Sequence, residues 1–110
     1  MIENLDFICA KYGEKLTEVT SDENLLRKSL GVLQEDGLYA FVIYLEKEKN
    51  NIKVKETIEK FLEEGKVLKE NEDLKNQEIY TNLHRLLMTK SVIEKMLIYA
   101  IYHIKAGESK

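Results

Sequence analysis

Apolar residues recur at intervals of three and four positions along most of the chain, and this spacing is typical of amphipathic helices. The stretches that show it hold these apolar positions, in chain order: Leu5, Ile8, Tyr12, Leu16 and Val19; Leu26, Leu30 and Leu33; Val54, Ile58, Phe61 and Leu68; Ile79, Leu83, Leu86 and Leu87; Val92, Met96, Tyr99 and Ile104. Each set falls on one face of a helix, so we expect that face to point into a common core.

Polar residues and a glycine indicate where the second of these helices begins and ends. Thr20 and Glu23 have the spacing of a capping box, with Ser21 and Asp22 as competing caps. Gly37 follows the helix, at a position where the left-handed conformation costs a glycine little. The second helix is therefore predicted between these two signals.

Later boundaries are less sharply defined by the sequence. The pair Asn50–Asn51 predicts a turn, and Gly65 predicts the end of the helix that follows. Thr89 or Ser91 can cap a final helix that ends at Gly107, or that helix is continuous with the one before it.

Residues 38–45 form an unbroken apolar run that, by itself, fits a buried strand as well as a helix. The run continues directly into the charged residues 46–49, and the sequence offers no partner strand with clean alternation. We therefore expect a helix. An almost wholly apolar helix must be buried on most sides, which predicts that it lies at the centre of the fold.

Residues 69–77 are almost entirely charged or amide-bearing, with Leu74 as their only apolar side chain, and we expect an exposed, mobile loop there. Proline is absent and the five glycines are scattered, which favours helices joined by short turns. Gly13 lies inside the first helix, and the sequence there is compatible with either a kinked or a straight helix. Together these features predict an all-α fold, a compact bundle of five to six helices.

The length of 110 residues matches one domain, and we expect residues 1–110 to form it. An apolar content of 44% is enough to build a core despite 34% charged residues. Cys9 is the only cysteine, so no intrachain disulfide can form, and its place on an apolar face predicts burial. The sequence has neither a signal peptide nor an apolar run of membrane-spanning length, so we expect a cytoplasmic protein with no membrane contact.

The residues that carry chemistry form no recognisable catalytic or metal-binding motif. His84 and His103 are the only histidines, and no thiol or carboxylate lies near either at the spacing of metal ligands. Ser29, Ser91 and Cys9 lack a neighbouring motif that would mark a nucleophile, and no glycine-rich phosphate loop is present. We therefore expect no catalytic residue, no metal and no cofactor, and a protein that is not an enzyme.

Two groups of side chains remain as candidate contact residues. The first, called here the basic set, would contact phosphates without reading bases, although a net charge of −3 is not typical of an independent nucleic-acid-binding domain. The alternative is that these residues are ordinary solvated charges. The basic set comprises Lys11, Lys15, Arg27, Lys28, Lys47, Lys49, Lys53 and Lys55. The second group is either core boundary or anchors for a partner, and comprises Tyr39, Tyr44, Tyr99 and Tyr102.

The stretch from Leu30 to Leu45 resembles part of the small all-helical subunit of CRISPR effector complexes, above all that of the Cmr complex. In that family a helix runs through a leucine-rich segment, breaks at a Gly-Leu pair and resumes as an apolar helix that ends in basic residues. The matching residues are Leu30, Leu33, Gly37, Leu38, Ala40, Phe41 and Leu45, followed by Lys47 and Lys49. The family commonly has a proline before this pair and the chain has none, so the small subunit of an archaeal Cascade-type complex is a close alternative.

The resemblance implies a non-catalytic structural subunit that takes part in antiviral defence. Such a subunit packs along the backbone filament of a ribonucleoprotein complex and contacts guide RNA and target nucleic acid through lysine and arginine. Its partners would be the other effector subunits, and self-association stays open. The residues alone leave a second function open, that of a helical protein–protein adaptor or regulator with no nucleic-acid role.

Overall fold

The computed structural model describes residues 5–108, and within this range the chain forms six α-helices and no strand. They are α1 (Leu5–Leu16), α2 (Glu23–Asp36), α3 (Leu38–Glu46), α4 (Lys49–Glu64), α5 (Gln77–Thr81) and α6 (Leu83–Glu108). The predicted all-α bundle is confirmed, including a helix rather than a strand at residues 38–45. None of the helices described combines the length and the apolar character that crossing a bilayer requires.

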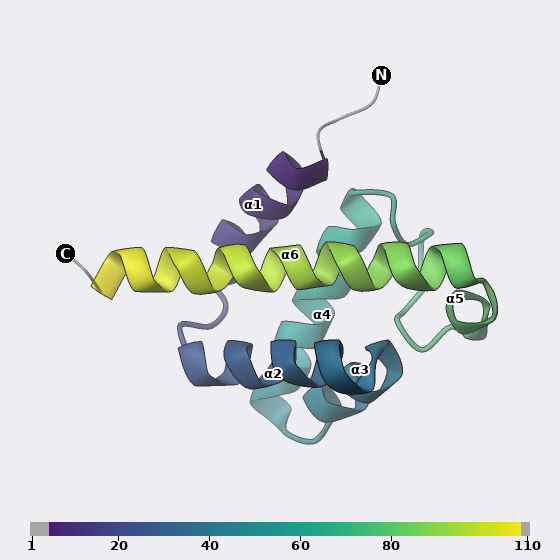
Figure 1. Ribbon diagram of the computed structural model, residues 1–110, viewed down its shortest axis with the longest axis horizontal. Coiled ribbons are helices and arrows are strands. Elements are labelled where there is room, and N and C mark those ends of the chain that lie inside the picture. Colours follow the sequence, from purple (N-terminus) through teal and green to yellow (C-terminus); the bar gives the residue numbers. More distant parts are fainter. Residues whose placement is uncertain (1–4, 109–110) are drawn as a thin grey trace.

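The longest helix, α6, runs across the molecule and packs against α1, α2 and α5 (Figure 1). In this view α1 and α2 lie on opposite sides of α6, and α4 lies behind it. One face of α6 is buried over its middle turns, through Val92, Ile93, Met96, Leu97 and Ala100. The core therefore forms between this face and the helices around it.

The apolar helix α3 lies at the side of the bundle, packed between α2 and α4, and not at the centre as predicted. Its buried side chains are Leu38, Phe41, Val42 and Leu45, which fall on one face. Tyr39 and Ile43 project from the other face into solvent. The prediction was wrong because α6 supplies a longer buried face, and α3 needs only one face to complete the core.

Gly13 allows α1 to approach α6 at backbone distance. A Cβ atom at this position would lie 2.7 Å from the Cβ of Tyr99, 2.8 Å from the carbonyl oxygen of Met96 and 2.9 Å from the nitrogen of Ala100. Two of these three atoms are main chain and cannot move aside locally. α1 continues as a helix through Gly13, so the glycine serves close packing there.

The boundaries of α2 follow the predicted signals, although a different residue caps the helix. The Asp22 carboxylate accepts a hydrogen bond from the Leu25 N–H at 3.1 Å, and Thr20 instead accepts one from the Asp22 N–H. At the other end Gly37 has φ of +98°, a conformation that residues with a side chain rarely adopt. The prediction of a left-handed glycine between α2 and α3 is confirmed.

Two later boundaries differ from the sequence-based expectation. Asn50 and Asn51 lie in the first turn of α4, and the chain turns before them, between α3 and Lys49. The last helix runs without a break from Leu83 through Thr89 and Ser91, as in the alternative of one continuous helix, but it does not include Ile79. The break lies at Asn82, whose side chain accepts a hydrogen bond from the Arg85 N–H. The first turns of α6 therefore extend well before the buried part of the helix.

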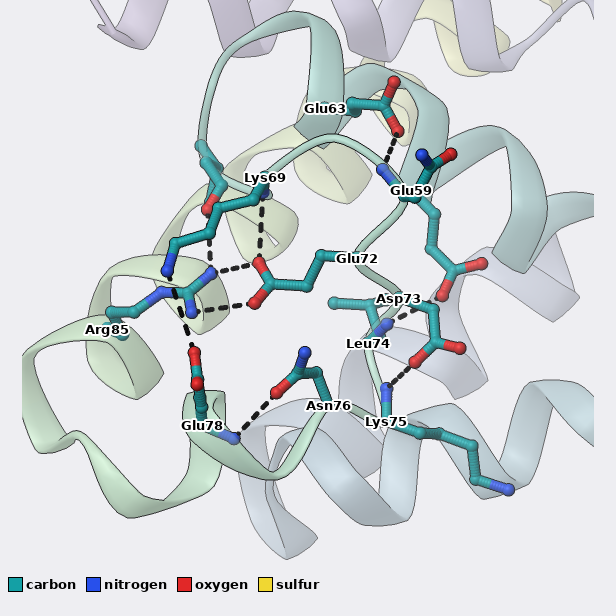
Figure 2. Close-up of polar contacts among 12 residues, drawn as sticks. Glu59, Glu63, Lys69, Glu72, Asp73, Leu74, Lys75, Asn76, Glu78 and Arg85 are labelled. Atoms are coloured by element: carbon teal, nitrogen blue, oxygen red, sulfur yellow. Dashed lines mark hydrogen bonds and ion pairs between the residues drawn. The ribbon is translucent and has the colours of Figure 1, made fainter.

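The polar segment 69–77 is a loop that leads into α5, but it is not exposed throughout (Figure 2). Glu72 and Leu74 are buried. The Glu59 carboxylate on α4 accepts a hydrogen bond from the Leu74 N–H at 2.8 Å, which fixes the loop where its one apolar side chain enters the core. The expectation of an exposed loop is wrong for Glu72 and Leu74 and holds only for the remaining side chains. The hydrogen bond to Glu59 supplies the partner that the backbone N–H of a buried residue needs.

Arg85 on α6 forms the second attachment of this loop. Its guanidinium group pairs with both carboxylate oxygens of Glu72 and also donates to the carbonyl of Val67 (Figure 2). The hydrogen bonds from Arg85 hold the pKa of the Glu72 carboxyl below its usual range, and a hydrogen bond from the Lys69 N–H acts in the same direction. Because the folded state depresses this pKa, the pair stabilises the fold above the ordinary pKa of glutamate and loses that effect as the pH falls through the depressed value.

The contact at Gly13 can be tested with a pair of glycine substitutions. Gly13→Ala should lower the free energy of unfolding by about 1–3 kcal/mol, since the added methyl group meets backbone atoms. Gly31→Ala is the matched control, because nothing lies within 4 Å of its position in α2. The control should stabilise the protein by about 0.5–1 kcal/mol through helix propensity. Urea unfolding followed by circular dichroism measures both, and a stabilising Gly13→Ala would contradict the close approach.

The attachment of the loop to α6 can be tested through its dependence on pH. Arg85→Leu should lower the free energy of unfolding by about 1–3 kcal/mol at neutral pH, because it leaves the buried Glu72 carboxylate without its partner. The loss should shrink as Glu72 becomes protonated at acid pH. Lys69→Gln is the control, since Lys69 pairs with Glu78 at 3.7 Å in solvent and should matter little. An equal loss at neutral and acid pH would show that Glu72 is not the group involved.

Candidate functional site

The basic set is spread over several elements of the fold. Lys11 and Lys15 lie on α1, Arg27 and Lys28 on α2, Lys47 at the C-terminal cap of α3, and Lys49, Lys53 and Lys55 at the start of α4. All of them except Lys55 are exposed. The structure therefore leaves seven of the eight candidates accessible to a partner.

Three of these lysines surround the short link between α3 and α4. Lys47, Lys49 and Lys53 are exposed there, and within residues 5–108 no carboxylate forms an ion pair with any of them. The Lys47 ammonium lies 6.0 Å from the centre of the Tyr44 ring, at the outer limit of a cation–π contact. Among the predicted residues, the lysines at this junction form the densest group of positive charges without an ion pair.

Lys55 does not belong to that surface. Only 11% of its side chain is exposed, and its ammonium group lies 3.3 Å from Glu59 and 3.6 Å from Glu46. Glu46 is in turn shared with Lys75, 3.0 Å away. The predicted phosphate contact is wrong for this residue, because its charge joins α3, α4 and the loop before α5.

The basic residues of α1 and α2 are only partly available. Arg27 donates to Glu23 at 2.6 Å on its own helix, whereas Lys28 is exposed. Each of the two helices packs against α6, and they lie on opposite sides of it in Figure 1. A single patch that joins Lys11 and Lys15 to the residues of α2 stays a prediction.

A second candidate surface was not predicted, and it comprises exposed apolar side chains of α6. We call it the outer face of α6. It exposes 69% of Leu83, 56% of Leu87, 43% of Met88 and 62% of Tyr102. Leu83 and Leu87 had been assigned to a buried helix face, which was wrong because α6 begins before it reaches the core. Leu83, Leu87 and Met88 are grouped within the first two turns of α6, whereas Tyr102 lies about four turns further on. Large apolar side chains grouped in this way mark a contact surface more often than scattered single ones do.

The four candidate tyrosines divide into two pairs. Tyr39 and Tyr102 are exposed, as expected of anchors for a partner, whereas Tyr44 and Tyr99 are half-buried at the edge of the core. The hydroxyl of Tyr99 donates to Asp6 at 2.8 Å. Hydrogen bonds from Lys95 and from this tyrosine lower the pKa of the Asp6 carboxyl, so the contact joins α1 to α6 electrostatically.

The residues that could perform chemistry are dispersed in the structure. Among the side chains described, no three of the histidine, cysteine, aspartate and glutamate type gather closely enough to hold a metal ion. His84 and His103 are both exposed on α6. Cys9 is fully buried, as predicted, and burial raises the pKa of its thiol, which disfavours the reactive thiolate.

Comparison with protein-family models, with curated proteins and with solved structures finds no match to the chain. The resemblance to the small CRISPR subunit therefore depends on the quoted residues alone. In the structure these residues lie along the end of α2, the Gly37 break and α3. Leu33, Leu38, Phe41 and Leu45 are buried and Leu30 is half-buried, so the pattern also has a purely structural explanation.

The role assigned to Lys55 can be tested by comparing it with Lys53 on the same helix. Lys55→Met should lower the free energy of unfolding by about 1 kcal/mol, because Glu59 loses its ion pair with Lys55, whereas Glu46 keeps its ion pair with Lys75. Lys53→Met should leave stability nearly unchanged, since Lys53 is exposed. Thermal unfolding by circular dichroism measures both. If the two substitutions have equal effects, Lys55 does not join the helices as described.

Proposed function

We propose that this chain is a non-catalytic small subunit of a CRISPR ribonucleoprotein effector complex. In this proposal the outer face of α6 packs against neighbouring protein subunits. The lysines at the junction of α3 and α4 contact the phosphates of guide RNA or target nucleic acid.

The outer face of α6 is the observation that carries the proposal. A folded monomer gains nothing from exposing Leu83, Leu87 and Met88 together at the start of its longest helix, whereas burial against another protein would remove their apolar surface from water. Large aromatic and aliphatic side chains of this kind commonly anchor protein interfaces. The dispersed catalytic residue types agree with a protein that acts by contact.

The nucleic-acid part of the proposal rests on Lys47, Lys49 and Lys53. They are exposed, close in sequence and without carboxylate partners among the described residues. Phosphate contacts through a few lysines are weak in isolation and strengthen beside other basic subunits. A net charge of −3 is compatible with such a shared groove.

A protein–protein adaptor with no nucleic-acid role is the alternative, and the internal ion pairs favour it. Arg27 and Lys55 of the basic set are committed to carboxylates of the same chain. The outer face of α6 would serve an adaptor equally well. The two functions differ in whether RNA is present in the assembly.

The deciding experiment is purification of the tagged chain from its own host, with sequencing of any RNA that accompanies it. The proposed function requires co-purification of a large complex that contains guide RNA. Stable protein partners that persist after nuclease treatment and carry no guide RNA would establish the adaptor instead.

The contribution of α6 can be measured with one substitution in the same experiment. Leu87→Asp should reduce the recovered partner proteins about tenfold or more, because a charge would replace an apolar anchor. Its melting temperature should stay close to that of the unmodified chain, since Leu87 is more than half exposed. Leu87→Met, which keeps the apolar surface, is the control and should retain the partners. Full recovery with Leu87→Asp would show that the outer face is not the contact.

A further inference from the structure

A hollow of about 420 Å³ opens between the segment that precedes α2 and the first turn of α4. Its walls include Thr20, Ser21 and Asp22 from the first segment and Glu48, Asn51 and Lys53 from the second. The lining is mainly polar, and two helices begin beside it. The groups in this hollow are unusual in three respects.

The first unusual feature is the start of α4, a helix of 16 residues that has no side-chain cap. Glu48 occupies the capping position but forms no capping hydrogen bond, whereas Asp22 caps α2 across the same hollow. The N–H groups of Lys49 and Asn50 have no acceptor within the described chain. N–H groups left open at a helix N-terminus favour the approach of an anion.

The second is the charge at the start of α4. Its first turn holds no acidic residue, and Lys49 and Lys53 stand at the end of the helix where the dipole is already positive. Lysines are disfavoured there unless a negative group compensates them. Within the hollow no carboxylate does so by an ion pair with either lysine.

The third is Asn51, which points to a ligand independently of the helix end. Only 8% of the residue is exposed, yet its side-chain amide has no hydrogen-bond partner among the described residues. Among the described residues no unpartnered side-chain nitrogen or oxygen is fully buried, so the Asn51 amide reaches solvent. Its access is through the hollow that it lines, where a ligand could accept its hydrogen bonds.

We propose that this hollow binds a phosphate group. The N–H groups of Lys49 and Asn50 and the amide of Asn51 donate hydrogen bonds to its oxygens, and Lys53 balances its charge. Asp22, which also caps α2, and Glu48 both line the hollow, and their negative charges oppose the anion and weaken the site. The source of the phosphate rests on the proposed function, in which it is a phosphodiester of single-stranded RNA and not free orthophosphate.

The test is a titration of the isotopically labelled full chain, followed by amide NMR. Inorganic phosphate is added in one series and sodium chloride at the same ionic strength in another. A 10-nucleotide single-stranded RNA, sized for a site of about 4–16 nucleotides, is added in a third. Phosphate should shift the amide signals of Lys49 and Asn50 and the side-chain signal of Asn51, with chloride leaving them in place. The RNA should shift the same signals at a concentration at least about tenfold lower, because neighbouring lysines add contacts.

Asn51→Leu separates a ligand role from a structural one. The substitution removes an amide that has no hydrogen-bond partner among the described residues, so it should leave the melting temperature unchanged or higher while it weakens phosphate binding about tenfold. If Asn51 were instead a structural residue, the same substitution would lower the melting temperature. Glu48→Gln should strengthen binding, since it removes the opposing charge.

Lys53→Gln should also weaken binding, and Lys60→Gln, two turns further along α4 and exposed, is its matched control and should not. Equal shifts with chloride and phosphate, or unchanged binding in Asn51→Leu, would overturn the site. Phosphate binding without RNA binding would overturn the RNA source and count against the nucleic-acid part of the proposed function. Co-purification with a complex that contains guide RNA does not depend on either result.

Discussion

The close approach of α1 to α6 at Gly13 is the contact on which the rest of the fold depends. With no side chain at this position, the backbone of α1 lies against main-chain atoms of Met96 and Ala100. Cys9 and Leu16, about one turn to either side, are then completely buried. A wider spacing would leave a gap along this interface, and side chains beside a gap lose their dispersion contacts. The glycine therefore matters for its size and not for its backbone freedom.

Because α6 is fixed along one face by α1 and α2, its other face remains outside the core over the whole length of the helix. The helix begins at Leu83, where Asn82 caps it, several turns before its buried middle. Apolar residues consequently occur on both of its faces, and the simple periodic pattern is blurred. This explains why the sequence placed Leu83 and Leu87 in the core, and why their exposure carries information about partners.

Features that depend on neighbouring residues were predictable, and features that depend on tertiary contacts were not. Gly37 acts through its own backbone conformation, and Asp22 through an N–H three residues away. Arg85, the partner of Glu72, and Glu46, one of the two partners of Lys55, lie on other elements, so no spacing rule could identify them. Sequence identified the basic set as charged residues, but only the structure separates Lys55, which joins helices, from Lys53, which faces solvent.

The start of α4 differs from the rest of the chain because several local rules fail there together. α2, α5 and α6 each begin with a side chain that accepts a hydrogen bond from an early N–H group, whereas α4, like α3, does not. In α4 lysines also stand where acids are favoured, and the amide of Asn51, a residue only 8% exposed, has no hydrogen-bond partner among the described residues. Natural chains tend to break such rules at functional sites, where stability gained elsewhere offsets the cost. Packing along α6 can provide that stability, because its buried face does not depend on how α4 begins.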